Sequence, residues 1–163
     1  MKDLLSDTLN LDASPSYRLY RTARVIRSDL NRLLRSLEIA VTPEQWVLLF
    51  RLNEKDGQSQ SEVSGRFFDD PPNITRILDA LVKHRFVVRV PDGNDRRKFL
   101  IYLTHDGRKF IEKTQPLVIE KRKRVFRGFS ASDIDQFIGY LNQVESNVLD
   151  DKQMAPASGD VSS

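Results

Sequence analysis

Residues 71–103 read PPNITRILDALVKHRFVVRVPDGNDRRKFLIYL, and they decide the fold because two different periodicities follow one another in them. The second part holds two short runs rich in β-branched and aromatic residues, 86–90 and 99–103, with turn residues between them. The first part has the spacing of one apolar helix face, made by Ile74, Ile77, Leu78, Leu81 and Val82. This order predicts a helix followed directly by a β-hairpin.

A shorter helix is predicted just before this segment, at about residues 59–68. The Asp-Asp-Pro-Pro run at 69–72 then supplies a capping carboxylate, and its prolines stand where their missing N–H groups do no harm. Two helices joined by a turn of a few residues are a helix-turn-helix candidate. A helix-turn-helix followed by a hairpin with a basic tip is a winged helix, and this combination is far more specific than either part alone.

Helical patterns precede the winged helix. The segment 17–38 lacks Gly and Pro, and its apolar residues have a heptad-like spacing on one face. They are Leu19, Ala23, Ile26, Leu30, Leu33 and Leu37. Thr42, Pro43 and Glu44 then match an N-cap, a first-turn proline and an acidic first turn. A second helix is therefore expected from Thr42 to about Asp56.

Helical patterns also follow the hairpin. Thr104 is placed to cap a helix, although Gly107 stands where a capping box would have Glu, and we expect a kink or break at Pro116. Residues 130–149 predict the last helix. Its apolar face is made by Ile134, Phe137, Ile138, Leu141, Val144 and Val148. Residues 150–163 contain too few apolar side chains to pack, and we expect them to be disordered.

The composition excludes several classes of protein and indicates that the binding partner is a polyanion. The 163 residues include no cysteine, which excludes disulfide scaffolds, zinc ribbons, thiol nucleophiles and cysteine redox sensors. The formal net charge of +3 is unevenly distributed. Residues 71–98 hold seven Lys and Arg against three Asp, residues 99–128 hold eight against three acidic residues, and residues 129–163 hold one against six. Such a basic cluster is the electrostatic footprint of a polyanion-binding protein.

The second helix of the helix-turn-helix candidate carries polar residues suited to base recognition. Asn73, Thr75 and Arg76 lie in its first two turns, the part that reaches base edges when such a helix enters the major groove. Asn pairs well with adenine, Arg with guanine, and Thr with a thymine methyl group or a phosphate. The simpler alternative is an amphipathic helix whose polar face is only solvated.

The hairpin tip is the second candidate surface for DNA. An arginine on a two-stranded wing can enter the narrow minor groove, where the potential is most negative. Asp95 is unusual in a loop facing phosphate, and we expect it to hold a neighbouring arginine in a binding rotamer. The simpler alternative is an ordinary solvated turn. The loop residues are Asp95, Arg96, Arg97 and Lys98.

Other kinds of site find less support in the sequence. His84 and His105 are the only histidines, and neither has a metal-ligand partner at suitable spacing, so we expect no metal and no cofactor. There is no glycine-rich phosphate loop and no nucleophile motif, so an enzyme is not expected. Aromatic residues beside arginines suit a pocket for an aromatic or carboxylate ligand, although core packing is the simpler interpretation of each. The candidates are Tyr20, Arg24, Trp46 and Phe50.

The ordered motifs resemble those of the MarR family of bacterial transcription regulators. Residues 60–64 (QSEVS) and 70–81 (DPPNITRILDAL) look like the helix-turn-helix of that family. Residues 95–98 (DRRK) resemble its wing with the Asp-x-Arg motif, and residues 103–108 (LTHDGR) resemble the start of its next helix. The order of elements is similar from about Tyr17 to Leu149, nearly the whole chain.

The resemblance implies a homodimer in which the first and last helices intertwine and two winged helices bind a pseudo-palindromic site. It also implies control by a small ligand bound between the dimerisation helices and the winged helix. By position, Arg97 falls on the wing arginine and Asp95 on its aspartate, and Ser61 and Pro72 complete the candidate DNA-binding set. The chain departs from many members where it has Arg85 and Phe68 in place of glycine. The lack of cysteine excludes the peroxide-sensing branch.

We therefore predict a mainly helical fold with a small β-hairpin wing (α+β). A winged helix-turn-helix at 42–104 lies between dimerisation helices at 17–41 and 105–149, with an extension at 1–16 and a tail at 150–163. We expect the protein to be a homodimeric repressor that binds sites in double-stranded DNA and is controlled by a small aromatic or anionic effector. The main alternative is a winged helix that binds an acidic protein. No apolar run approaches the roughly 18 residues of a membrane span, so we expect a cytoplasmic protein without a membrane partner.

Overall fold

Two capped helices open the described part of the chain. The computed structural model describes residues 11–65, 71–93, 95 and 98–154. After a short 3-10 turn, η1 (Leu11–Ala13), helix α1 (Pro15–Arg35) begins at the Ser14 cap and ends three residues earlier than the pattern predicted. Helix α2 (Pro43–Glu54) begins as predicted, and Thr42 and Gln45 form a full capping box. Prolines at the first turn of both helices cost no hydrogen bond there.

A helix-turn-helix follows α2, and it includes a strand that the sequence did not predict. Strand β1 (Gln58–Ser59) leads into α3 (Gln60–Gly65), and α4 (Pro71–Lys83) is the second helix. The helix predicted to about Phe68 is seen to Gly65, and the predicted residues 66–68 lie outside the described residues. Gln60 Nε2 donates to Thr75 Oγ1 at 2.6 Å, a bond that joins α3 to α4.

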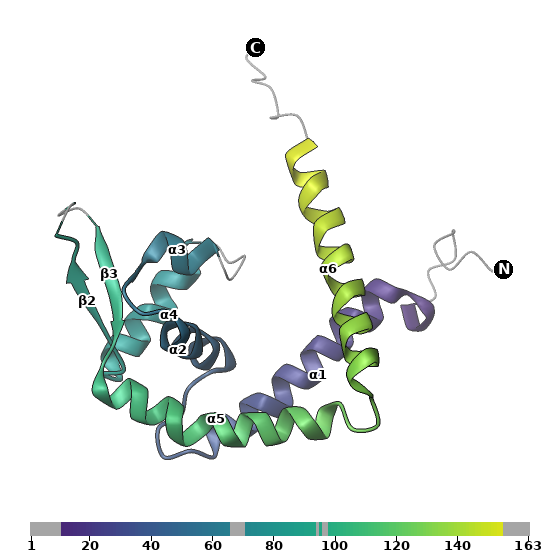
Figure 1. Cartoon of the computed structure of the whole chain (residues 1–163), viewed down its shortest axis with the longest axis horizontal. Helices are drawn as coiled ribbons and strands as arrows, with labels where there is room; N and C mark the ends of the chain where they lie inside the picture. The colour runs from purple at the N-terminus through teal and green to yellow at the C-terminus, as the bar shows by residue number, and fades with distance from the viewer. Residues whose placement is uncertain (1–10, 66–70, 94, 96–97, 155–163) are drawn as a thin grey trace, which may run out of the picture. The chain divides into compact units, whose positions relative to one another are not determined.

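The wing is an antiparallel sheet of three strands in the order β1-β3-β2 (Figure 1). Strands β2 (Val87–Pro91) and β3 (Phe99–Leu103) form the predicted hairpin, with Val87 opposite Leu103 and Pro91 opposite Phe99. Strand β1 pairs with the other edge of β3, where Gln58 lies opposite Ile101. The wing is thus anchored on both edges of its central strand, which fixes its base against the helix-turn-helix.

The corner between α4 and β2 has the hydrogen bonds of a Schellman motif, with an arginine where glycine is usual. Phe86 N–H donates to Leu81 O and Arg85 N–H donates to Val82 O, at 3.0 and 2.9 Å. Arg85 has φ 61°, the left-handed conformation. Phe86 and Leu81 are both buried, as this motif favours. The chain therefore keeps a left-handed corner here although Arg85 stands where this motif usually has glycine.

Helix α5 (His105–Val125) starts close to this corner, and the close approach explains why α5 has glycine at position 107. The Thr104 hydroxyl accepts from Gly107 N–H at 3.0 Å, the predicted cap, while Thr104 N–H donates to Phe86 O. A Cβ on Gly107 would overlap the Phe86 carbonyl oxygen, so glycine is required by close approach of the backbone. The helix continues past Pro116 as predicted, and it runs to Val125 without the break that was the alternative to a kink.

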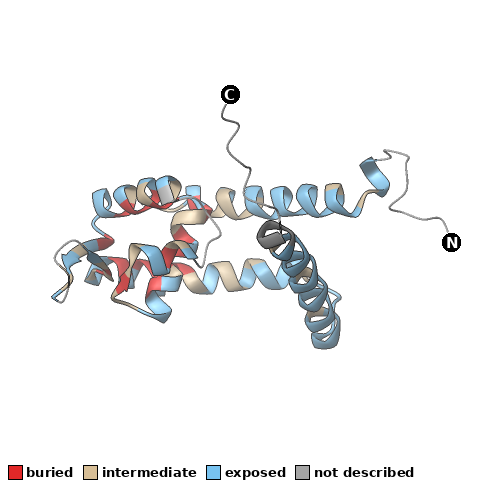
Figure 2. Cartoon of the chain, turned by 90° about the horizontal axis from the view of Figure 1, so that it is seen from above, coloured by how far each residue is buried: buried red, intermediate tan, exposed pale blue. Residues whose placement is uncertain are grey.

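One hydrophobic core lies within the winged helix and the helix segments that adjoin it. Figure 2 shows the buried residues gathered there. Leu34 is the buried residue of α1, whereas Leu30 and Leu37 of the predicted face only pack partly against the core. The largest fully buried side chains include Leu48, Leu49, Leu52, Ile74, Leu78, Leu81, Ile101 and Ile111.

The chain divides into two compact units, residues 1–122 and 123–163. Within the second unit, helix α6 (Ala131–Met154) starts from a capping box formed by Ser130 and Asp133. It runs to Met154, five residues past the predicted end, and so extends into the predicted tail. Residues 155–163 of that tail lie outside the described residues. In the described ranges, no helix has both the length and the apolar character needed to cross a membrane.

Candidate nucleic-acid interface

The first two turns of α4 present the predicted polar side chains in different ways. Pro72 and Arg76 are exposed, and Asn73 is half-buried. Arg76 Nη2 donates to Asn73 Oδ1 at 2.9 Å, so the two predicted base-contacting residues form one hydrogen-bonded pair on the surface. Thr75 is half-buried and its hydroxyl accepts from Gln60 of α3. The structure therefore brings Asn73 and Arg76 together and turns Thr75 toward the neighbouring helix.

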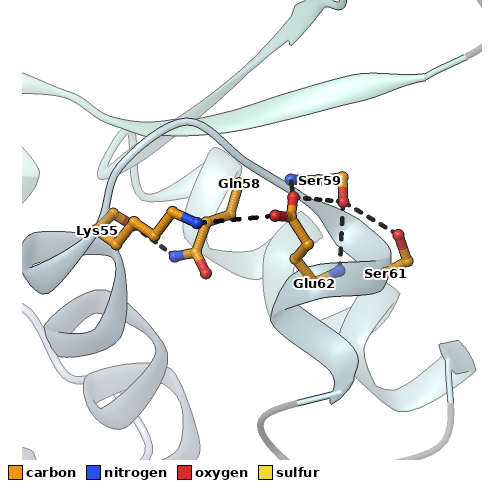
Figure 3. Close-up of polar contacts among 5 residues, drawn as sticks. All are labelled: Lys55, Gln58, Ser59, Ser61 and Glu62. Atoms are coloured by element: carbon orange, nitrogen blue, oxygen red, sulfur yellow. Dashed lines mark hydrogen bonds and ion pairs between the residues drawn. The ribbon is translucent and has the colours of Figure 1, made fainter.

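A polar cluster fixes the start of α3, where Ser61 lies exposed (Figure 3). Glu62 Oε2 accepts from both the backbone N–H and the hydroxyl of Ser59, each at 2.8 Å. Lys55 Nζ lies 3.9 Å from Glu62 Oε1, and Ser61 Oγ lies 3.0 Å from Ser59 Oγ. Beneath them, Gln58 is 1% exposed and donates to Lys55 O. These bonds set the entry of α3 and hold Ser61 at the surface.

The wing tip carries the predicted basic loop, of which two residues are described. Lys98 Nζ lies 3.6 Å from Asp95 Oδ2, and the Lys98 N–H donates to the Asp95 carbonyl oxygen at 2.9 Å. Asp95 thus orients a basic neighbour, although the neighbour seen is a lysine and the prediction named an arginine. Arg96 and Arg97 lie outside the described residues.

Two ion pairs that the sequence did not reveal hold the wing in place. Arg89 Nη1 of β2 lies 2.6 Å from Asp79 Oδ1, and so the wing is tied to α4. Asp56 accepts from Leu103 N–H at 2.9 Å and pairs with Arg108 of α5. The partners in these contacts stand 10 to 52 residues apart. In the sequence, only Asp56 in a turn and Arg89 in a strand signalled these contacts.

A further ion pair joins α1 to the start of α2. Arg27 Nε lies 2.6 Å from Glu44 Oε1, and the hydrogen bond with Glu44 raises the pKa of Arg27. Burial pushes the pKa of Glu44 upward, but hydrogen bonds from Arg27, from its own backbone and from Thr42 outweigh burial, so that pKa is lowered. With Asn73 and Arg76, this pair lines a cleft of about 520 Å³. The Asn73–Arg76 pair of α4 thus borders α1 and α2.

The four predicted ligand-binding residues fall into two separate pairs. Tyr20 and Arg24 are exposed on α1, where Arg24 Nη1 donates to the Tyr20 hydroxyl at 3.2 Å. Trp46 is 7% exposed, stacks on Phe50 with ring centroids 5.4 Å apart, and donates to Thr114 Oγ1 at 2.8 Å. Three cavities in the described part of the chain are lined by residues other than these four. Their binding of a ligand stays a prediction.

Comparison with known proteins agrees with this architecture. The sequence model of the MarR family matches residues 41–99, which include α2, the helix-turn-helix, strand β2 and the first residue of β3. The HTH-type transcriptional regulator YkoM of Bacillus subtilis, itself uncharacterised, is 29% identical over 127 residues, 77% of this chain and 82% of its own length.

Two solved structures have the same fold. A mutant of MarR from E. coli, complexed with operator DNA, is 25% identical with a TM-score of 0.74, over 85% of this chain and 99% of its own. The PcaV regulator of Streptomyces coelicolor, in complex with its natural ligand, is 18% identical with a TM-score of 0.76, over 86% of this chain and 98% of its own. Together with the winged helix and its flanking helices, these matches show that the chain is similar to the MarR family of transcriptional regulators over the winged helix and has the fold of solved MarR proteins.

Proposed function

We propose that the chain is a homodimeric repressor that binds a pseudo-palindromic operator in double-stranded DNA with α4 and the wing. The observation that carries the proposal is the Asn73–Arg76 pair at the start of α4, in which Arg76 is exposed and Asn73 is half-buried, in a chain whose wing has a basic tip. Because the first turns of such a helix reach base edges, Asn73 and Arg76 are assigned to base reading. Thr75 is assigned to holding α3 against α4.

The wing and α3 make the remaining contacts with DNA in this proposal. Arg97 enters the minor groove, and Arg96 and Lys98 contact phosphates, which give affinity without sequence information. Ser61 is exposed next to the α3 cap, where a hydroxyl can meet a phosphate oxygen. Contacts to phosphate release counterions, so binding is expected to weaken steeply as salt is added.

The terminal helices support the homodimer. Side chains of Leu19 and Val25 on α1 and of Val144 and Val148 on α6 are exposed in the single chain. Exposed apolar surface of this extent marks an interaction site, and a two-fold interface can cover the same patch on both copies. Two-fold symmetry then sets the half-sites about one helical turn, roughly 34 Å, apart. A sedimentation coefficient of a monomer at micromolar concentration would contradict this part of the proposal.

Control by a small aromatic or anionic effector completes the proposal. A regulator of the same fold has been solved with its natural ligand, which shows what the fold can accommodate. A ligand that favours one spacing of the two winged helices by a few kcal/mol suffices to switch operator occupancy. Because its target is chromosomal DNA of a bacterium, the protein is proposed to act in the cytoplasm.

One experiment tests the DNA-binding part directly. DNA selected from a random library by the purified protein, and the region upstream of its own gene, are each tested in a mobility-shift assay. We expect a shift by wild type, and Arg76→Ala to weaken binding of the selected site by roughly 1–3 kcal/mol, because one base contact is lost. Arg32→Ala is the matched control, since Arg32 is an exposed arginine on α1.

The outcomes separate the two functions that the sequence left open. Equal affinities of wild type and Arg76→Ala would remove α4 from the interface. No shift with any DNA at low salt would contradict the proposal and favour the alternative, a winged helix that binds an acidic protein.

A further inference from the structure

Helix α1 carries a row of arginines on one exposed face. Its 21 residues include six arginines, a single acidic residue, Asp29, and no lysine. Positions 21, 24, 28, 32 and 35 are spaced by 3, 4, 4 and 3 residues, so they share one face, within roughly a quarter of the helix circumference. All five are exposed. We call this face the arginine stripe, and it consists of Arg21, Arg24, Ser28, Arg32 and Arg35.

The arginine stripe points away from the hydrophobic core. Leu34, the buried residue of α1, lies about 120° round the helix from Ser28 at the centre of the stripe. The side chain of Arg32 is 80% exposed. Most of α1 that precedes the winged helix is exposed (Figure 2). The arginines of the stripe therefore lie on the solvent side of the helix.

The arginine stripe also faces another side of α1 than the one near the base-reading residues of α4. Arg27 borders the cleft that Asn73 and Arg76 line. One step along an α-helix turns the direction of the side chain by about 100°, so Ser28 points away from the side of Arg27. A duplex read by α4 therefore meets the side of Arg27 and not the stripe.

The charges of the arginine stripe are not neutralised within the described part of the chain. The stripe twice has two arginines three residues apart, a spacing at which like charges destabilise a helix. Asp29 lies 2.8 Å from Lys121 Nζ of α5 and only 3.9 Å from Arg32 Nη1. Among the described residues, the other three arginines of the stripe take part in no ion pair. An external anion would relieve this repulsion.

The residue types of the arginine stripe suit phosphate groups. A guanidinium binds phosphate through two parallel N–H donors, which an ammonium group cannot do. A face that is only solvated can use lysine as well as arginine, and α1 has no lysine. Ser28 adds a hydroxyl, another common donor to phosphate oxygens.

The dimensions of the arginine stripe fit a DNA duplex. The stripe is about 21 Å long, and its two arginine pairs are centred about 16 Å apart along the helix axis. From these positions, long side chains can converge on the two phosphate backbones that flank a major groove about 12 Å wide. A helix that lies on a membrane inserts its apolar face, whereas the apolar face of α1 contains Leu34, which is buried in the core. A duplex therefore fits the stripe better than a lipid surface does.

We propose that the arginine stripe binds the phosphate backbone of a second DNA duplex, so that the protein bound to its operator through α4 and the wing holds another segment of DNA. The choice of DNA rests on the proposed function, which brings the chain to DNA, but the stripe shares no residue with α4 or the wing. Contacts to phosphate carry no sequence information. The stripe should therefore accept a duplex of any sequence.

A sandwich assay measures this second contact. The selected DNA site is immobilised, loaded with the full chain and washed, and a fluorescent duplex of unrelated sequence is then added over a series of salt concentrations. Capture on the immobilised DNA without protein is subtracted. We expect saturable capture that weakens steeply as salt is added, because phosphate contacts release counterions.

A stripe variant, Arg21→Gln/Arg24→Gln/Arg35→Gln, locates the second contact. It removes three cations and keeps side chains that are compatible with a helix. We expect capture to be roughly tenfold weaker or more, and the salt slope of log K to be smaller in magnitude by about 0.9 for each arginine removed. The affinity for the selected DNA site alone should equal that of wild type, since that site contacts α4 and the wing.

The matched control removes three exposed cations from α5, in the variant Lys109→Gln/Lys113→Gln/Lys123→Gln, and should capture the second duplex as wild type does. Circular dichroism and sedimentation velocity check the folding and the oligomeric state of both variants. Equal capture by wild type and the stripe variant overturns the proposal, and so does an equal loss in the control, because net charge would then be the cause. A stripe variant with an altered oligomeric state would place the stripe in the subunit interface and would also overturn it.

Competition tests other partners. Phosphatidylglycerol vesicles and polyglutamate, each at the same concentration of charge as the captured duplex, should leave it bound. Displacement by either would assign the stripe to a membrane or to an acidic protein and overturn the proposal.

Failure of the proposed function is distinguishable from failure of the stripe. If the chain binds no selected DNA site, the proposed function fails. Fluorescence anisotropy of the unrelated duplex with the free protein then tests the stripe, and binding lost in the stripe variant but kept in the control would support it. Binding that is equal in the two variants would overturn it.

Discussion

The winged helix and helix α6 bury their apolar side chains to very different extents (Figure 2). In the winged helix, Ile74, Leu78 and Ile101 are fully buried within one core. In α6, Phe137 is 39% exposed and Val148 is 53% exposed, although both lie on the apolar face that the sequence predicts for this helix. An apolar face therefore indicates which side of a helix is to be covered, and not whether the same chain covers it.

This contrast assigns different tasks to the two regions. Burial of large apolar side chains stabilises the winged helix within one chain, by about 1.5–3 kcal/mol for each side chain buried. The α6 side chains gain that stabilisation only when a partner covers them. Substitutions in the winged helix should therefore lower the stability of the chain, and substitutions on the apolar face of α6 should lower its assembly.

The largest expected effect is that of Gly107→Ala, in the first turn of α5 where it packs against the winged helix. The new Cβ would overlap the Phe86 carbonyl oxygen and meet Leu103 Cδ2 at 3.2 Å, so the corner must move and its bond to Thr104 must weaken. We expect a loss of roughly 3 kcal/mol in the free energy of unfolding, measured by urea denaturation. Gly139→Ala in α6 is the matched control, with no atom within 4 Å of the new Cβ, and a comparable loss there would contradict the comparison.

A smaller effect of opposite sign is expected for Arg85→Gly. Among the described residues, Arg85 is the only one with positive φ that is not a glycine. Relief of that conformation stabilises the folded state. The greater freedom of glycine in the unfolded state offsets part of the gain, which leaves about 0.5–1 kcal/mol. Arg85→Ala removes the same charge and keeps the strain, so it should show no gain. If both variants gain equally in thermal melting, charge and not backbone conformation is the cause.

The smallest effect on folding is expected for Val144→Asp on α6. Because Val144 is 47% exposed in the single chain, the unfolding free energy of the monomer should change by less than about 0.5 kcal/mol. Sedimentation velocity should nevertheless show a shift from dimer to monomer, since a charge is placed in the shared interface. Ser146→Asp adds the same charge to the opposite side of α6 and should stay dimeric. A dimeric Val144→Asp variant would place the interface elsewhere.

Local signals in the sequence were enough for most of the fold. Thr42 with Pro43 located the start of α2, the run of aromatic and aliphatic residues at 99–103 located β3, and the switch of period near Phe86 located the wing. Each of these depends on residues within a few positions of one another, which is the range over which caps and periodicities act. The same holds for the start of α6 at Ser130.

Long-range contacts account for what the sequence did not reveal. Strand β1 is two polar residues long and exists because Gln58 and Ser59 pair with β3, more than 40 residues away. The ion pair between Arg89 and Asp79 depends on the corner that brings β2 back beside α4. Trp46 lies in the core because Thr114, 68 residues later, satisfies its indole N–H. No local pattern encodes such distances.

The most direct test of the central claim, that α4 and the wing bind DNA, is the affinity for a selected DNA site measured by fluorescence anisotropy across a salt series. If α4 and the wing bind DNA, log K falls linearly with log salt concentration, with a slope of about −0.9 for each phosphate contacted. We also expect Arg97→Ala to weaken the binding free energy by roughly 1–3 kcal/mol and Arg32→Ala to leave it unchanged. An affinity that is constant with salt, or equal in wild type and Arg97→Ala, would contradict it.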